Sequence, residues 1–138
     1  MRIMAIDYGD AHTGIAISDP TGLLAGFTTV INSRRQEVVV EQVAALAKEH
    51  GAEELVLGHP VNMDGTLGPR SEKAMAMKVL LEEATSLPVV LWDERRTTID
   101  AHNILFNSGK NAKQRKKVVD AVAASLILEG YLTFKKSR

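Results

Sequence analysis

Carboxylates occupy three positions of this 138-residue chain where a charge is costly to keep. Asp7 ends an apolar run, Asp93 and Glu94 end another, and Asp120 is the single ionisable residue between 118 and 128. A carboxylate in a low-dielectric setting must be paired, heavily hydrogen-bonded or bound to a cation. Clustered carboxylate oxygens suit Mg²⁺ or Mn²⁺, and two such ions about 4 Å apart can hold a phosphodiester and activate a water molecule.

Each of these acids also has a simpler explanation. Residues 7–10, Asp-Tyr-Gly-Asp, could form an ordinary hairpin turn, although Gly9 would also let a ligand approach the strand end closely. Asp120 could be a helix-start residue that pairs with Lys116 or Lys117 one turn earlier. An apolar helix face is an unusual setting for a simple surface pair, so a functional role for Asp120 stays open.

Alternating strand and helix patterns supply the elements that would position these acids. Apolar runs with turn residues at their ends predict strands over residues 2–7, 14–20, 24–31, 54–57 and 87–92. Helical periodicity predicts helices over residues 36–50, 71–85, 97–106 and 116–134. The order βββαβαβαα predicts an α/β fold with a mixed five-stranded sheet flanked by helices. Right-handed crossovers would bring the carboxyl ends of the parallel strands, and so the acids, to one edge.

The connections between these elements carry further signals. We expect the tip of the first hairpin at residues 10–13 and an N-cap for the first helix at Asn32 or Ser33, with Gly51 at its C-terminal end. The long segment between His59 and Arg70 has no periodicity and directly follows a strand, which favours a functional loop. Residues 107–115 are polar and lysine-rich, and we expect a loop there.

Composition limits the class of protein. With 45% apolar and 25% charged residues the sequence is typical of one soluble domain, here residues 1–138. It has no cysteine, no signal peptide and no apolar run of membrane length, so we expect a cytoplasmic protein without disulfides and without a membrane partner. Seventeen basic residues balance seventeen acidic ones, and the basic run at 110–117 could be a solvated face. No pair of the four histidines has zinc-ligand spacing; they are His12, His50, His59 and His102.

Four motifs in this order resemble those of the YqgF/RuvX family and span almost the whole chain. They are Asp7-x-Gly9-x-x-x-x-Gly14-x-Ala16-x-Ser18-Asp19, Gly58-x-Pro60-x-x-Met63-Asp64-Gly65-Thr66-x-Gly68, Asp93-Glu94-Arg95-x-Thr97-Thr98, and Asp120-x-x-Ala123-Ala124. The resemblance implies an RNase H-like fold. It also implies a nuclease of the kind described either as a Holliday-junction resolvase or as an enzyme that matures the 5′ end of pre-16S rRNA.

The resemblance also implies which residues act. It makes Asp7, Glu94 and Asp120 the catalytic acids and the ligands of two Mg²⁺ or Mn²⁺ ions, and it alone selects Glu94 over Asp93. His12-Thr13 stands where the family usually has a basic pair, which is a departure at the hairpin tip. The residues expected to contact the substrate are Gly9, Asn62, Thr66, Arg70, Arg95, Lys113, Arg115, Lys116 and Lys117.

Three classes of function remain open. A metal-dependent nuclease is favoured, acting on RNA in preference to branched DNA, as a monomer or weak homodimer. An ATP-binding domain of the actin and sugar-kinase type would need a second phosphate loop and a second lobe, for which 138 residues leave little room. A non-catalytic nucleic-acid-binding module would fit the zero net charge, but it would not need all three acids.

Overall fold

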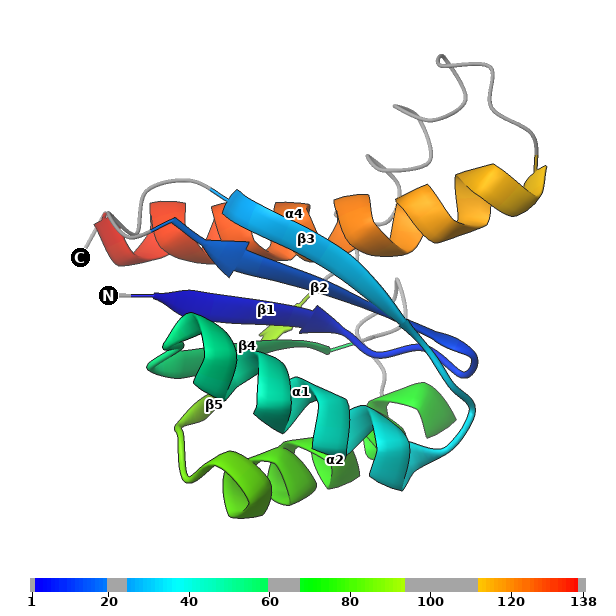
Figure 1. Ribbon diagram of the computed structural model, residues 1–138, viewed down its shortest axis with the longest axis horizontal. Coiled ribbons are helices and arrows are strands. Elements are labelled where there is room, and N and C mark those ends of the chain that lie inside the picture. The colour runs from blue at the N-terminus through cyan, green and yellow to red at the C-terminus, as the bar shows by residue number, and fades with distance from the viewer. Residues whose placement is uncertain (1, 20–24, 60–67, 94–111, 137–138) are drawn as a thin grey trace.

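A computed structural model describes residues 2–19, 25–59, 68–93 and 112–136, with only the backbone described at 25, 69–70, 93, 112–121 and 136. The described residues form a five-stranded mixed sheet with strand order β3-β2-β1-β4-β5 (Figure 1). The strands are β1 Ile3–Asp7, β2 His12–Ser18, β3 Ala25–Asn32, β4 Glu54–His59 and β5 Val89–Asp93. The helices are α1 Gln36–His50, α2 Pro69–Thr85 and α4 Ala112–Lys136. The predicted mixed sheet is confirmed, while the helix expected at 97–106 lies outside the described residues.

Helices cover both faces of the sheet. Helices α1 and α2 pack on one face, and α4 crosses the other face over β1, β2 and β3 (Figure 1). Strand β1 is central: it pairs antiparallel with β2 and parallel with β4, which in turn pairs parallel with β5. The carboxyl ends of β1, β4 and β5 therefore point to the same edge of the sheet.

The apolar run that ends at Asp7 is buried on both faces, as its lack of polar alternation predicted. Met4 and Ile6 join the core beneath α1 and α2. Ile3 and Ala5 join the second core, beneath α4, where they meet residues such as Ile127. Because strand side chains alternate between faces, Asp7 continues the row of Ile3 and Ala5 on the α4 face.

The first hairpin is tighter than expected. Strand β2 begins at His12. The prediction that residues 10–13 form the hairpin tip is therefore wrong for His12 and Thr13. His12, the first residue of β2, is already paired with Asn32 of β3. The next residue, Thr13, is fully buried. Cross-strand register decides this boundary, and polar residues near a turn do not reveal it.

The bounds of α1 agree with the prediction, but its cap does not. Arg35 occupies the N-cap position and its side chain makes no capping hydrogen bond. The Ser33 hydroxyl accepts a hydrogen bond from the Arg35 N–H at 3.1 Å, but Ser33 lies two residues before the N-cap position and so does not cap the helix. Gly51 ends the helix in the left-handed conformation, φ 68°, as predicted, and its N–H is directed at the carbonyls of Ala47 and Lys48.

Helices α2 and α4 both begin earlier than the sequence predicted. Helix α2 starts at Pro69, since a proline is well tolerated in the first turn. Helix α4 starts at Ala112, so the expectation of a loop through 115 is wrong from that residue on. The run Ala112-Lys-Gln-Arg-Lys-Lys117 contains only strong helix formers, which outweighs its polarity. No helix in the described ranges is both long and apolar enough to cross a membrane.

Candidate functional site

Asp7 lies at the carboxyl end of the central strand. It is the last residue of β1, it is partly buried, and it is paired across β2 with Gly14. Gly14 has no side chain, so β2 presents only backbone beside the Asp7 carboxylate at this level of the sheet. Strands β4 and β5 both end one residue further on, where His59 and Asp93 are paired. The acid predicted from the first motif therefore lies at the expected edge.

Gly9 has a structural reason to be glycine. A Cβ placed at this position would lie 2.4 Å from the backbone carbonyl oxygen of His12, closer than real Cβ contacts come. The tight turn between β1 and β2 thus excludes any side chain at residue 9. The expected contact between Gly9 and a substrate stays a prediction.

The other two predicted acids are placed only in part. Asp120 lies in α4, one turn before Ala124, and Ala124 is fully buried against the sheet in the core beneath this helix. The Asp120 side chain is not described. Glu94 follows the last residue of β5 and lies outside the described residues.

Within the described ranges, no group of three or more histidine, cysteine, aspartate or glutamate side chains could hold a metal ion. This result does not test the predicted set, because Asp7 is its one member with a described side chain. The ligand assignment stays a prediction.

Some of the expected substrate-contacting residues lie in described parts of the chain and others do not. Asn62, Thr66 and Arg95 lie outside the described residues. The backbone of Arg70 lies in the first turn of α2. The basic residues of the last motif region share the first two turns of α4, on the same helix as Asp120; they are Lys113, Arg115, Lys116 and Lys117.

The structure adds polar pairs near this edge that sequence reasoning missed. His12 and Asn32 share a hydrogen bond of 2.6 Å between Nδ1 and Oδ1, across β2 and β3. His59, at the end of β4, shares one of 2.5 Å between its Nε2 and the Oγ of Ser71, which is fully buried in α2. These histidines are scattered in sequence, and only strand register and helix packing reveal their partners.

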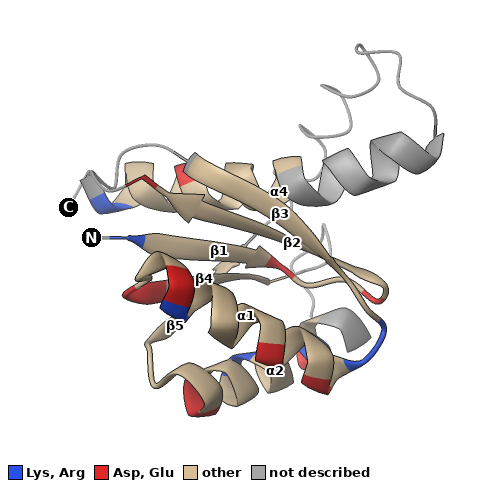
Figure 2. Cartoon of the chain, in the orientation of Figure 1, with Lys and Arg blue, Asp and Glu red and all other residues tan. Residues whose placement is uncertain are grey.

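An ion pair ties the first hairpin to α2. Lys73 Nζ lies 3.4 Å from Asp10 Oδ1, and both side chains are more than half exposed. One resolved pKa shift lies away from this edge: a backbone hydrogen bond, followed by one from Arg35, lowers the pKa of Glu37. Basic and acidic positions are interspersed over α1 and α2 (Figure 2), in keeping with the zero net charge.

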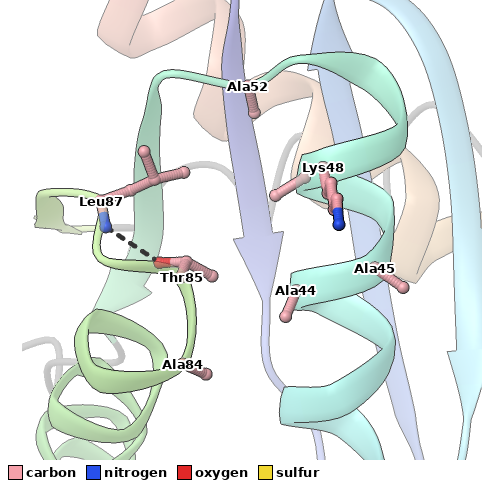
Figure 3. A pocket seen from close by; sticks show the side chains of 8 residues that line it. Ala44, Ala45, Lys48, Ala52, Ala84, Thr85 and Leu87 are labelled. Carbon is pink, nitrogen blue, oxygen red and sulfur yellow. Dashed lines mark hydrogen bonds between the residues drawn. The ribbon is translucent and has the colours of Figure 1, made fainter.

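A cavity of about 440 Å³ lies between the C-terminal parts of α1 and α2. Ala44 and Lys48 line one side, and Ala84, Thr85 and Leu87 line the other (Figure 3). The Thr85 hydroxyl already donates to the Leu81 carbonyl at 2.7 Å and accepts from the Leu87 N–H at 3.2 Å. The described lining contains no carboxylate, so this cavity is not the predicted metal site.

Comparison with known proteins identifies related sequences along nearly the whole chain. A family model described as RuvX, Holliday junction resolvase, matches residues 1–134. A Halothermothrix orenii protein, named as a pre-16S rRNA nuclease, is 43% identical over 135 residues, which cover 98% of this chain and 96% of that protein.

Solved structures with a similar fold include a resolvase and a sugar kinase. RuvC of T. thermophilus, in complex with Holliday junction substrate, has a TM-score of 0.66 at 14% identity and matches over 99% of this chain and 96% of its own. A ROK hexokinase from Thermus thermophilus has a TM-score of 0.52 at 23% identity and matches over 75% of this chain but 38% of its own. At these identities the likenesses concern the fold, which is RNase H-like, as predicted.

Proposed function

This chain belongs to the RuvX family, and from that premise we propose that it is a metal-dependent nuclease that matures the 5′ end of pre-16S rRNA. The observation that carries the proposal is the position of Asp7. It ends the central strand at the edge where β4 and β5 also end, on the face that α4 covers. Active sites of open α/β sheets lie at this kind of edge.

The family resemblance selects Glu94, and not Asp93, as the second acid. In β5, Val90 and Trp92 pack on the α4 face, whereas Val89 and Leu91 pack on the face of α1 and α2. Glu94 itself lies outside the described residues, directly after the last residue of this strand.

Helical spacing supports Asp120 as the third acid. Ala124 and Ile127 of α4 pack against the sheet, and Asp120 precedes them by four and seven residues. Residues at these spacings share one face of a helix. We therefore propose that Asp7, Glu94 and Asp120 converge between β1, β5 and α4.

The donor set fits Mg²⁺ or Mn²⁺, because the proposed ligands are carboxylates and Asp7 is only partly buried at an open edge. When bound, such ions polarise the scissile phosphate and lower the pKa of a water molecule for attack. Asp7, Glu94 and Asp120 would hold the ions in place. The basic first turns of α4 and the segment at 58–70 would bind the phosphate backbone of the substrate.

Two observations favour an RNA end as the substrate. The curated relative is named for pre-16S rRNA, and the chain has no net charge with which to hold two duplex arms. A single-stranded RNA end needs a smaller contact surface. Such an enzyme would act in the cytoplasm, where ribosomal RNA is processed, and it would need one active site per reaction.

Junction resolution is the second candidate, because the family model carries that description and the RuvC structure holds a Holliday junction. It would need two active sites, and so a stable homodimer that pools two basic surfaces. The sugar-kinase likeness favours no second function, since this chain matches only 38% of that protein.

A competition assay tests the proposal. A precursor-rRNA fragment and a synthetic four-way junction are offered together in Mg²⁺ and in Mn²⁺, with Asp7→Asn in parallel. We expect cleavage of the RNA by the parent protein only. Symmetric paired nicks in the junction with intact RNA would establish the resolvase, and binding without any cleavage would establish a non-catalytic module.

A further inference from the structure

The cross-strand pair of His12 and Asn32 lies on the same face of the sheet as Asp7. Residues paired directly across strands share a face, so Asp7 and Gly14 lie on the same face of the sheet. His12 lies two residues before Gly14 in β2, and residues two apart in a strand also share a face. Ala16, the next in this row, packs beneath α4. His12 is thus the diagonal neighbour of Asp7, a relationship that places residues about 7–8 Å apart.

Nothing in the hairpin stands between these two side chains. The residue opposite Asp7 is Gly14, and the turn before His12 excludes a side chain at Gly9. The His12–Asn32 hydrogen bond is itself exposed. A ligand held at Asp7 would therefore meet no side chain of the hairpin on its way to the His12 ring.

The hydrogen bond fixes which ring nitrogen of His12 is available. With the Oδ1 of Asn32 facing the ring, the 2.6 Å bond selects the tautomer in which Nδ1 of His12 is the donor. In the neutral ring this leaves Nε2 as an acceptor. The described part of the chain provides no hydrogen-bond partner for Nε2.

We propose that His12, held by Asn32, accepts a hydrogen bond at Nε2 from the ribose 2′-hydroxyl of an RNA strand bound at Asp7. This inference rests on the proposed nuclease function and names the feature that would select RNA over DNA. A neutral acceptor cannot bond to a phosphate oxygen, which is also an acceptor, but it matches a hydroxyl donor. The 2′-hydroxyl is the group that distinguishes RNA from DNA at a given nucleotide. His12 is in this role a specificity residue that contacts the substrate, and Asn32 is a positioning residue.

The experiment uses the full chain and a set of precursor-rRNA fragments with one sugar changed at each nucleotide around the cleavage site. Each position carries ribose, 2′-deoxyribose or 2′-fluororibose, since the fluoro sugar keeps the ribose pucker without the donor. In the parent protein we expect one position at which both changes lower kcat/KM about 2- to 12-fold, the range of one hydrogen bond.

The same substrates are then given to His12→Phe, which keeps a planar ring without the acceptor, and to Asn32→Ala, which removes the tether. We expect the sensitivity at that position to vanish in His12→Phe and to shrink in Asn32→Ala, as in a double-mutant cycle. His50→Phe is the matched control, because His50 lies at the far end of α1 and its ring stacks on Phe27 at 4.5 Å. It should keep the full sensitivity.

The outcomes separate this inference from the proposed function. If the parent protein cleaves the RNA but no single sugar matters, or if His12→Phe keeps the full sensitivity, the ribose contact is wrong while the nuclease stands. If His12→Phe does not fold, as judged by circular dichroism, Asn32→Ala decides the question. If the parent protein cleaves none of the substrates, both proposals fall together.

Discussion

The hydroxyl of Tyr131 in α4 donates a hydrogen bond to the Oε1 of Glu54 at the start of β4. Both residues are buried, and the second oxygen of Glu54 accepts a hydrogen bond from Lys135 Nζ at 3.4 Å. This contact fixes the C-terminal half of α4 along the sheet. Asp120 precedes Tyr131 by eleven residues, about 16 Å along a helix axis. The same contact therefore helps to set the position of Asp120 along the sheet.

Replacing Tyr131 by Phe should lower the free energy of unfolding by about 1–2 kcal/mol, because the buried Glu54 carboxylate loses its neutral donor. Urea denaturation followed by circular dichroism measures the change. The matched control is Lys135→Ala: the Lys135 side chain is 38% exposed and its ammonium lies 3.4 Å from Glu54, so its loss should cost less than the Tyr131 change, about 0.5 kcal/mol. Equal losses in the two variants would contradict the special role of Tyr131.

Asp7→Asn should reduce cleavage at least about 100-fold while the protein stays folded, because an amide is a poorer metal ligand than a carboxylate. Without divalent ions the variant should be as stable as the parent or more stable, since one of several clustered negative charges is gone. Cleavage assays and thermal unfolding with and without Mg²⁺ check both points. A variant that cleaves at the parent rate, or one that does not fold, would make Asp7 a structural turn residue.

The basic first turns of α4 should bind phosphates of the substrate. Replacing Lys113, Arg115, Lys116 and Lys117 together by Ala should weaken RNA binding and reduce the slope of log K against log salt by about 0.7 for each phosphate that is then left without a basic partner. Alanine preserves the helix, so the effect is electrostatic. Turnover at saturating substrate should change much less than binding.

The control for this variant is Lys48→Ala, an exposed change on α1 that should alter neither affinity nor salt slope. Parent values of both quantities in the fourfold variant would show that the basic turns are only a solvated surface.

Two glycines should respond in opposite ways to alanine. Gly9→Ala should destabilise the protein by about 1–3 kcal/mol, because the new Cβ would overlap the His12 carbonyl, 2.4 Å away. Gly130→Ala should stabilise it by up to about 1 kcal/mol, because a helical glycine is replaced and the new Cβ would lie an acceptable 3.4 Å from Trp92. Thermal unfolding of both variants tests the pair, and a stable Gly9→Ala would show that the hairpin backbone can shift.

Local sequence patterns predicted the central elements of the fold. The unbroken apolar run before Asp7 identified a strand buried on both faces, and periodicity with Gly51 identified both ends of α1. Each of these features is determined by residues close together in sequence. The fold class followed from the order of such elements.

Boundaries that depend on distant partners were predicted less well. The start of β2 is set by its pairing with β3, and the start of α4 by helix propensity in a run that polarity alone assigned to a loop. The position of Asp7 in the candidate site was predicted because its motif is local. His12 and Asn32 lie twenty residues apart, and no local pattern shows that they meet.

The single uninterrupted span of α4 has a geometric consequence. Its 25 residues form a rod about 37 Å long whose C-terminal half is packed on the sheet from Ala124 to Leu132, and its first turns extend past the strands in Figure 1. The basic turns and Asp120 belong to this one continuous helix, so helix geometry fixes their spacing. A phosphate held by the basic turns would therefore lie at a set distance from Asp120.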